Sequence, residues 1–98
     1  MKYWDVAVEA PLNRLFTYAS EREVHPGQSV EVPFGKRKTR GVVIAPSVSK
    51  SFDHDVKPIA EGDSERPTLT AALMEWGAGI AKYYHYPAGE VFSMFFPP

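Results

Sequence analysis

Polar and apolar side chains alternate along the first ten residues of the chain. Trp4, Val6 and Val8 fall on one side of an extended backbone, and Asp5 and Glu9 fall on the other. Successive side chains of a strand point to opposite faces of a sheet, so this period of two predicts a half-buried strand over residues 3–10. Segments rich in β-branched and aromatic residues predict four further strands, over residues 15–19, 29–34, 40–45 and 56–60.

The pattern changes in the last third of the chain. From Leu69 to Tyr84, apolar residues recur at spacings of three and four, which is the period of one face of an α-helix. Thr68 is placed to cap the start of this helix, and Pro87 either ends it or begins a second, short helix. The apolar stripe expected on this helix comprises Leu69, Leu73, Trp76, Ile80 and Tyr83 or Tyr84.

Five strands followed by helix predict a mainly β protein, a small bent barrel with one long and one short helix at its C-terminal end. A length of 98 residues suits one domain. We expect the barrel in about residues 1–62 and the helical part in residues 67–96. The sequence finishes in aromatic and proline residues rather than in a polar tail, and we interpret it as a fragment that ends at a domain boundary.

Positive charge is concentrated at one point of a chain that has no net positive charge. The formal net charge is −1, yet four of the 11 Lys and Arg residues fall within five positions, in the turn after the third predicted strand and at the first residue of the fourth. Cations gathered at a hairpin tip suit contact with the phosphate backbone of DNA, although a solvated turn would have the same composition. The candidate backbone-binding residues are Lys36, Arg37, Lys38 and Arg40.

The sequence has no pattern typical of catalysis or of a resident cofactor. It contains no cysteine, and His25, His54 and His85 lack the spacing of metal ligands. The acidic residues between positions 53 and 65 lie in polar, loop-like sequence rather than in a packed cleft. We therefore expect no catalytic residue, no metal site and no cofactor in this chain. No apolar segment approaches the ~20 residues that would span a membrane.

Two aromatic residues of the second predicted strand are a further candidate binding feature. Phe16 and Tyr18 alternate onto one face, where their rings could stack on unpaired bases, although such rings commonly pack into the core. Gly35 is either a positive-φ turn residue or a point where a nucleotide can approach the backbone. Lys57 interrupts an apolar segment, either as a gatekeeper of an edge strand or as a phosphate contact. The residues alone leave these alternatives open.

In combination, these motifs resemble a known family. The motifs run in the order Pro11-Leu12, Phe16-x-Tyr18, Val32-Pro33-Phe34-Gly35-Lys36, Val56-Lys57-Pro58-Ile59 and Tyr83-Tyr84-His85-Tyr86-Pro87-Ala88-Gly89-Glu90. Over essentially all of its length the chain resembles the N-terminal DNA-binding domain of primosomal protein N′, a family of bacterial replication-restart helicases. The resemblance implies a permuted OB-like barrel that holds the 3′ end of the nascent leading strand at a stalled fork. It also implies that the chain is an N-terminal fragment of an ATP-dependent 3′→5′ DNA helicase.

The resemblance further implies a pocket for the 3′-terminal nucleotide formed by Phe16, Thr17, Tyr18, Gly35 and Lys57. The family usually has aspartate where this chain has Thr17. A hydroxyl is a weaker acceptor than a carboxylate, so we expect recognition of the 3′-hydroxyl to be weakened or mediated by water. Strict alternation would also turn Thr17 away from the two rings, unless a strand end or a bulge intervenes.

The partners implied by the resemblance are forked or single-stranded DNA with a 3′ end, the remaining domains of the parent helicase and other primosome proteins, with no membrane. ATP, Mg and Zn would belong to the parent rather than to this fragment, and we expect a cytoplasmic, nucleoid-associated protein. The alternative is a protein-interaction barrel that docks other domains of the parent helicase, or a primosome partner, through the hairpin tip and the C-terminal aromatic residues. DNA binding that depends on salt would separate the two hypotheses.

Overall fold

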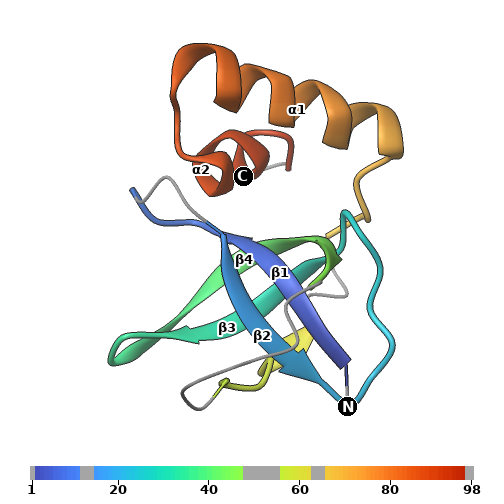
Figure 1. Cartoon of the computed structure of the whole chain (residues 1–98), viewed down its shortest axis with the longest axis vertical. Helices are drawn as coiled ribbons and strands as arrows, with labels where there is room; N and C mark the ends of the chain where they lie inside the picture. The colour runs from blue at the N-terminus through green and yellow to red at the C-terminus, as the bar shows by residue number, and fades with distance from the viewer. Residues whose placement is uncertain (1, 12–14, 48–55, 63–65, 97–98) are drawn as a thin grey trace.

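A computed structural model of the chain describes residues 2–11, 15–47, 56–62 and 66–96. The strands curl into a small barrel, and both helices lie on one side of it (Figure 1). Strands precede helices as the sequence predicts, and the mainly β, OB-like fold class is confirmed. The elements are β1 (Lys2–Val8), β2 (Phe16–Ser20), β3 (Ser29–Phe34), β4 (Arg37–Pro46), β5 (Glu61–Gly62), α1 (Ala71–Tyr84) and α2 (Ala88–Ser93).

One antiparallel sheet in the order β2-β1-β4-β3-β5 forms the wall of the barrel. β1 pairs with β2 in an uninterrupted register that sets Thr17 opposite Asp5 and Tyr18 opposite Trp4. The register between β1 and β4 shifts between Asp5 and Val6. An irregularity of this kind increases the local twist, which helps the sheet to curl.

The prediction of a fifth strand over residues 56–60 is wrong, because the short β5 follows this segment and pairs with β3. The segment instead connects the two edges of the sheet. On the β2 side, the Ala19 N–H donates a hydrogen bond to the Lys57 carbonyl (3.0 Å). On the β3 side, the Ala60 N–H donates to the Glu31 carbonyl (2.8 Å). A proline within the segment has no N–H to donate, so a regular ladder cannot form there.

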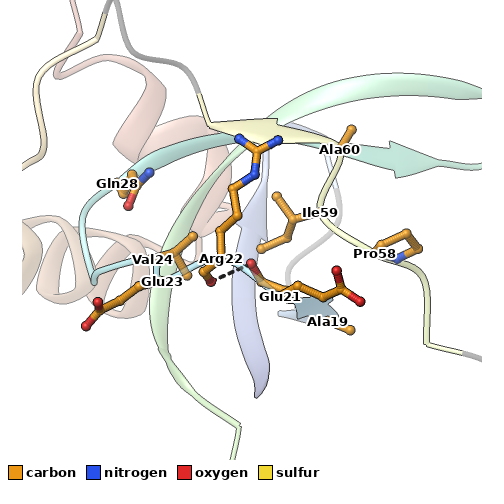
Figure 2. Close-up of a pocket in the computed structure, with 10 residues that line it drawn as sticks. Ala19, Glu21, Arg22, Glu23, Val24, Gln28, Pro58, Ile59 and Ala60 are labelled. Carbon is orange, nitrogen blue, oxygen red and sulfur yellow. Dashed lines mark hydrogen bonds between the residues drawn. The ribbon is translucent and has the colours of Figure 1, made fainter. Parts of the chain in front are cut away.

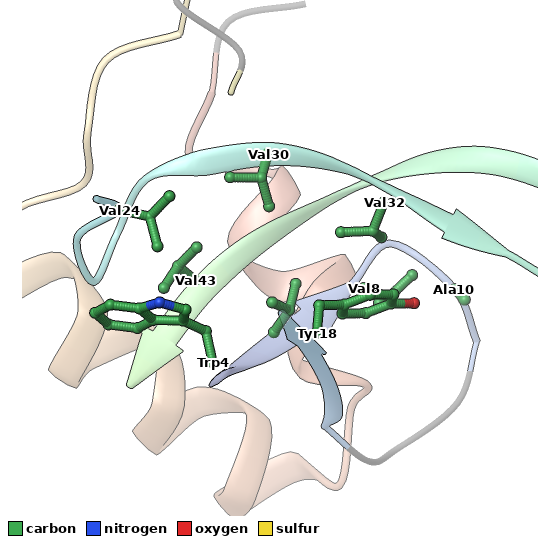
Figure 3. Close-up of a cluster of buried hydrophobic side chains, with 9 residues drawn as sticks. Trp4, Val8, Ala10, Tyr18, Val24, Val30, Val32 and Val43 are labelled. Carbon is green, nitrogen blue, oxygen red and sulfur yellow. The ribbon is translucent and has the colours of Figure 1, made fainter. Parts of the chain in front are cut away.

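The barrel interior is filled by side chains that the period-two pattern directs inward (Figure 3). Trp4, Val6 and Val8 of β1 are buried, and valines of β3 and β4 belong to the same cluster. Burial of these branched and aromatic side chains is the main force that holds the barrel together. The cluster comprises Trp4, Val6, Val8, Ala10, Tyr18, Val24, Val30, Val32 and Val43.

A second cluster fills the space between the outer face of the sheet and the helices. α2 rests on β1 and β4, and α1 packs against α2 (Figure 1). The middle of the sheet is therefore buried on both faces, which fixes the helical part on the barrel. The buried members of this cluster are Ala7, Val42, Leu69, Phe92 and Phe96.

The N-cap of α1 lies two residues later than predicted. Thr70, not Thr68, is the N-cap, and its Oγ1 accepts a hydrogen bond from the Leu73 N–H (3.2 Å). The helix ends at His85, which has the left-handed conformation (φ 58°) common at helix C-termini. Pro87 precedes α2, so the short second helix is confirmed.

The predicted apolar stripe of α1 is only partly right. Trp76 and Tyr83 are 62% and 77% exposed, whereas Gly77 and Ala81 are buried. The physical reason is the close approach of α2: a Cβ on Gly77 would stand 2.6 Å from the Phe92 ring. The aromatic side chains of α2 thus occupy the position that large residues of α1 would otherwise take.

Candidate nucleic-acid interface

The tip of the β3–β4 hairpin extends away from the helices (Figure 1). Gly35 and Lys36 form its two-residue turn, between the register partners Phe34 and Arg37. Gly35 has φ +64°, a left-handed conformation that favours glycine in hairpin turns. Apart from its two chain neighbours, no described residue has a heavy atom within 4 Å of where a Cβ on Gly35 would stand. The backbone is therefore open to close approach at this point.

All four predicted backbone-binding cations are exposed at this tip. β4 begins at Arg37, so Lys38 and Arg40 lie on a strand rather than in a turn. Arg40 is opposite Glu31 in the β3–β4 register, where opposite charges attract. The excess positive charge is therefore greatest at the end of the hairpin, around Lys36.

Phe16 lies close to this basic tip. Its ring packs edge-on against Phe34, with the ring centroids 5.1 Å apart and the planes at 83°. Both side chains are half-buried. Because Phe34 directly precedes Gly35, the ring pair and the open turn are neighbours. A half-exposed aromatic ring beside accessible backbone suits the stacking of an unpaired base.

Tyr18 lies in the core. Its side chain is 5% exposed, and its hydroxyl donates a hydrogen bond to the Pro33 carbonyl (2.9 Å). Burial raises the pKa of the Tyr18 phenol above its ordinary value of 10.0. The Tyr18 ring offers no open face to a base in this conformation. The hydrogen bond from Tyr18 holds Pro33 in place, and Pro33 directly precedes Phe34, so Tyr18 stabilises the base of the hairpin tip.

Thr17 points away from both rings, as alternation predicts. β2 begins at Phe16, and the β1–β2 register contains no bulge that would bring the three side chains together. On the outer face of the sheet, the Thr17 hydroxyl donates a hydrogen bond to Oδ1 of Asp5 (3.1 Å). Sequence reasoning did not single out Asp5, because its partnership with Thr17 becomes visible only when the strand register is known.

Lys57 is exposed, and its backbone is bonded to β2 at Ala19. The residues that follow it line a pocket of about 480 Å³ at the end of β2 (Figure 2). Glu21 and Glu23 extend to either side of Arg22 in this pocket. Two carboxylates around one guanidinium leave no excess positive charge, so the pocket itself does not suit a phosphate.

The five residues predicted for the terminal nucleotide are therefore not all in one place. Phe16 and Gly35 are near neighbours at the hairpin tip, and Tyr18 supports them from the core. Thr17 lies on the outer face, and Lys57 lies beside the far end of β2.

The described ranges contain no cluster of three or more His, Asp or Glu side chains placed to hold a metal ion. Neither α1 nor α2, the helices in those ranges, has both the length and the hydrophobicity that crossing a membrane requires. His54 and the acidic residues Asp53, Asp55, Asp63 and Glu65 lie outside the described residues.

Comparison with known proteins gives this surface a context. Residues 5–97 match the family described as the 3′DNA-binding domain (3′BD) of PriA. The replication restart protein PriA of Chlamydia trachomatis is 30% identical to the chain over 104 residues. The match covers 97% of the chain but only 14% of that relative, so the chain spans a small part of the length of such a protein.

Proposed function

Because the chain belongs to the 3′DNA-binding domain family of PriA, we propose that it is the DNA-recognition module of a replication-restart helicase. In this proposal it binds replication forks and holds the 3′ end of the nascent leading strand, while a larger parent protein supplies ATP-dependent helicase activity. The remaining domains of the parent and other primosome proteins would be its protein partners. The observation that carries the proposal is the hairpin tip, where exposed cations, an open glycine and a half-exposed ring pair are neighbours.

Each part of this surface has a separate role in the proposal. Lys36, Arg37, Lys38 and Arg40 attract the DNA backbone, because neutralised phosphates release their counterions. Phe16 offers its ring to a base near the strand end, a contact worth about 1–3 kcal/mol per base. Gly35 admits the nucleotide close to the backbone, and Lys57 contacts a phosphate or sugar. With few phosphates neutralised, the isolated module should bind weakly and with a marked dependence on salt.

Fluorescence anisotropy with a labelled, 3′-ended single strand tests the role of the tip. We expect a variant with Lys36, Arg37 and Lys38 replaced by glutamine to bind more weakly. Each phosphate contact contributes about 0.7 to the slope of log K against log salt for single strands, so loss of three contacts should reduce the slope by about 2. A control variant, Lys2→Gln with Arg22→Gln, removes two exposed cations elsewhere and should keep the wild-type slope. Wild-type affinity and slope in the tip variant would refute the assignment.

An exposed apolar surface on the helices favours a second candidate function, docking of protein domains. Trp76, Tyr83 and Met94 are 62%, 77% and 70% exposed. Exposed apolar patches of this kind often mark protein interaction sites. Because the chain spans 14% of its PriA relative, the remaining domains of such a protein are the occupants that we propose. Trp76→Ser with Tyr83→Ser should weaken association with those domains and leave DNA affinity unchanged. DNA binding that is absent or insensitive to salt would make docking the main function.

A further inference from the structure

The β3–β4 hairpin reaches beyond the body of the barrel as a two-stranded ribbon (Figure 1). Val32 is the last buried residue of β3, whereas Gly35 and Lys36, which form the turn, are exposed. A strand rises about 3.3 Å per residue, so the turn lies about 10 Å beyond Val32. The tip is therefore a narrow projection rather than part of a flat surface.

The ribbon carries positive charge on both of its faces. Arg37 pairs with Phe34 in the β3–β4 register, and Phe34 packs against the barrel core, so these two side chains share the inner face. Successive side chains of a strand point to opposite faces, so Lys38 lies on the outer face. Both cations are exposed, and in the described part of the chain neither forms an ion pair. Lys36 adds a third positive charge at the turn.

The dimensions and charges of this ribbon match the major groove of duplex DNA. The groove is about 12 Å wide and about 8.5 Å deep, and it admits a two-stranded β-ribbon. Stacked sheets pack about 10 Å apart, so one sheet with its side chains is about 10 Å thick and fits tip first between the groove walls. Phosphates line both walls, so an inserted ribbon needs cations on both faces. A ribbon that lay along the outside of the DNA backbone would use the cations of one face.

We propose that the tip of the β3–β4 hairpin inserts into the major groove of the duplex that adjoins the held strand end. Arg37 and Lys38 contact phosphates on the two opposite walls, and the turn at Gly35 faces the base edges. Gly35 suits this position because no side chain projects from it toward the floor of the groove. This inference rests on the DNA binding proposed above and adds the form of DNA that the tip recognises.

A duplex closed by a loop at each end tests the groove contact separately from end recognition, because it has no 3′ end. Bulky substituents on pyrimidine C5 project into the major groove and should weaken binding by roughly tenfold or more. Equally bulky substituents on guanine N2 project into the minor groove and should leave the affinity within about threefold of the unmodified duplex. A 3′-ended single strand with the same C5 substituents should bind as its unmodified form does.

Single substitutions test whether both faces of the ribbon touch the duplex. Arg37→Gln and Lys38→Gln each remove one cation, and each should reduce the slope of log K against log salt by about 0.9, the value for one phosphate of B-DNA. Arg22→Gln removes an exposed cation from the pocket at the end of β2 and should keep the wild-type slope. Circular dichroism of the three variants establishes that they are folded.

The outcomes separate this inference from the function on which it rests. Equal tolerance of C5 and N2 substituents overturns the inference, and so does a changed slope in only one or neither of the two tip variants. Binding of the 3′-ended single strand without binding of the closed duplex also overturns it and leaves the proposed function intact. If the wild-type chain binds neither DNA at low salt, the proposed function fails as well.

Discussion

α2 packs on β1 through a glycine that leaves no room for a side chain. A Cβ on Gly89 would overlap the carbonyl oxygen of Val8, a backbone atom of the barrel wall. Gly89 is buried, and it lies at the second position of α2. Gly89→Ala must therefore move α2 away from β1, which loosens the apolar cluster beneath it. We expect this substitution to destabilise the whole domain.

The size of this effect follows from two opposing terms. Overpacking a well-packed site costs about 1–3 kcal/mol. A strand carbonyl cannot rotate away as a side chain can, so the cost at Gly89 should be near the upper end of that range. Alanine gains about 1 kcal/mol over glycine inside a helix, which leaves a net loss of about 2 kcal/mol. For a domain of this size, about 1 kcal/mol shifts Tm by about 4–8 °C, so Tm should fall by about 8–16 °C.

Gly79→Ala is the matched control. Gly79 lies within α1. Apart from its chain neighbours and the nearby backbone of α1, no described residue has a heavy atom within 4 Å of where a Cβ on Gly79 would stand. The same propensity gain without a clash should raise Tm by about 4–8 °C. Thermal and urea unfolding followed by circular dichroism measure both variants. The close packing of α2 on β1 is refuted if the free energy of unfolding of Gly89→Ala lies within about 1 kcal/mol of the wild-type value, or if both variants shift Tm in the same direction.

Two further predictions concern single hydrogen bonds. Thr70→Ala removes the oxygen that caps α1 at the Leu73 N–H and should lower the free energy of unfolding by about 1 kcal/mol. Thr70→Asn supplies another capping oxygen and should restore the stability, so equal stability of the two variants would contradict the role of the cap. Tyr18→Phe removes the bond to Pro33 and should cost about 1 kcal/mol near neutral pH. Burial raises the pKa of the Tyr18 phenol in the folded chain above 10.0, so the unfolded chain loses the phenol proton at a lower pH than the folded chain does. The neutral phenol therefore stabilises the fold fully below pH 10.0, and this stabilisation is lost as pH rises through the folded pKa. In urea unfolding from about pH 8 to about pH 11, the free energy of unfolding should fall more steeply with pH for the wild type than for Tyr18→Phe. Parallel curves for the two proteins would contradict this effect of the Tyr18 phenol.

The parts of the fold that the sequence predicts well are those set by local rules. The alternation of Trp4, Val6 and Val8 reports directly which face of β1 points into the barrel, because the period of a strand is fixed by its geometry. The hairpin around Gly35 is predicted for a similar reason, since two strand-like segments flank a short turn that requires a positive φ. Neither feature depends on distant contacts.

The parts that the sequence misses depend on neighbours that are far away along the chain. The buried face of α1 passes through Gly77 because rings of α2 approach it, and the period of α1 alone cannot report that contact. Asp5 acquires its partner only through the register of β1 with β2. Tyr18 is a residue type that often binds bases, but its position opposite Trp4 in the β1–β2 register places it in the core.

The alternation of β2 has a direct consequence for how DNA would be recognised. Phe16 and Thr17 are adjacent in sequence but lie on opposite faces of the sheet, so they cannot line one pocket unless a bound strand crosses the edge of β2. β2 is an edge strand, and in the described ranges the partner on its outer side is the segment bonded at Ala19, beyond Thr17. A nucleic acid strand bound at the basic tip would therefore meet Phe16 on that side of the sheet and would not meet Thr17.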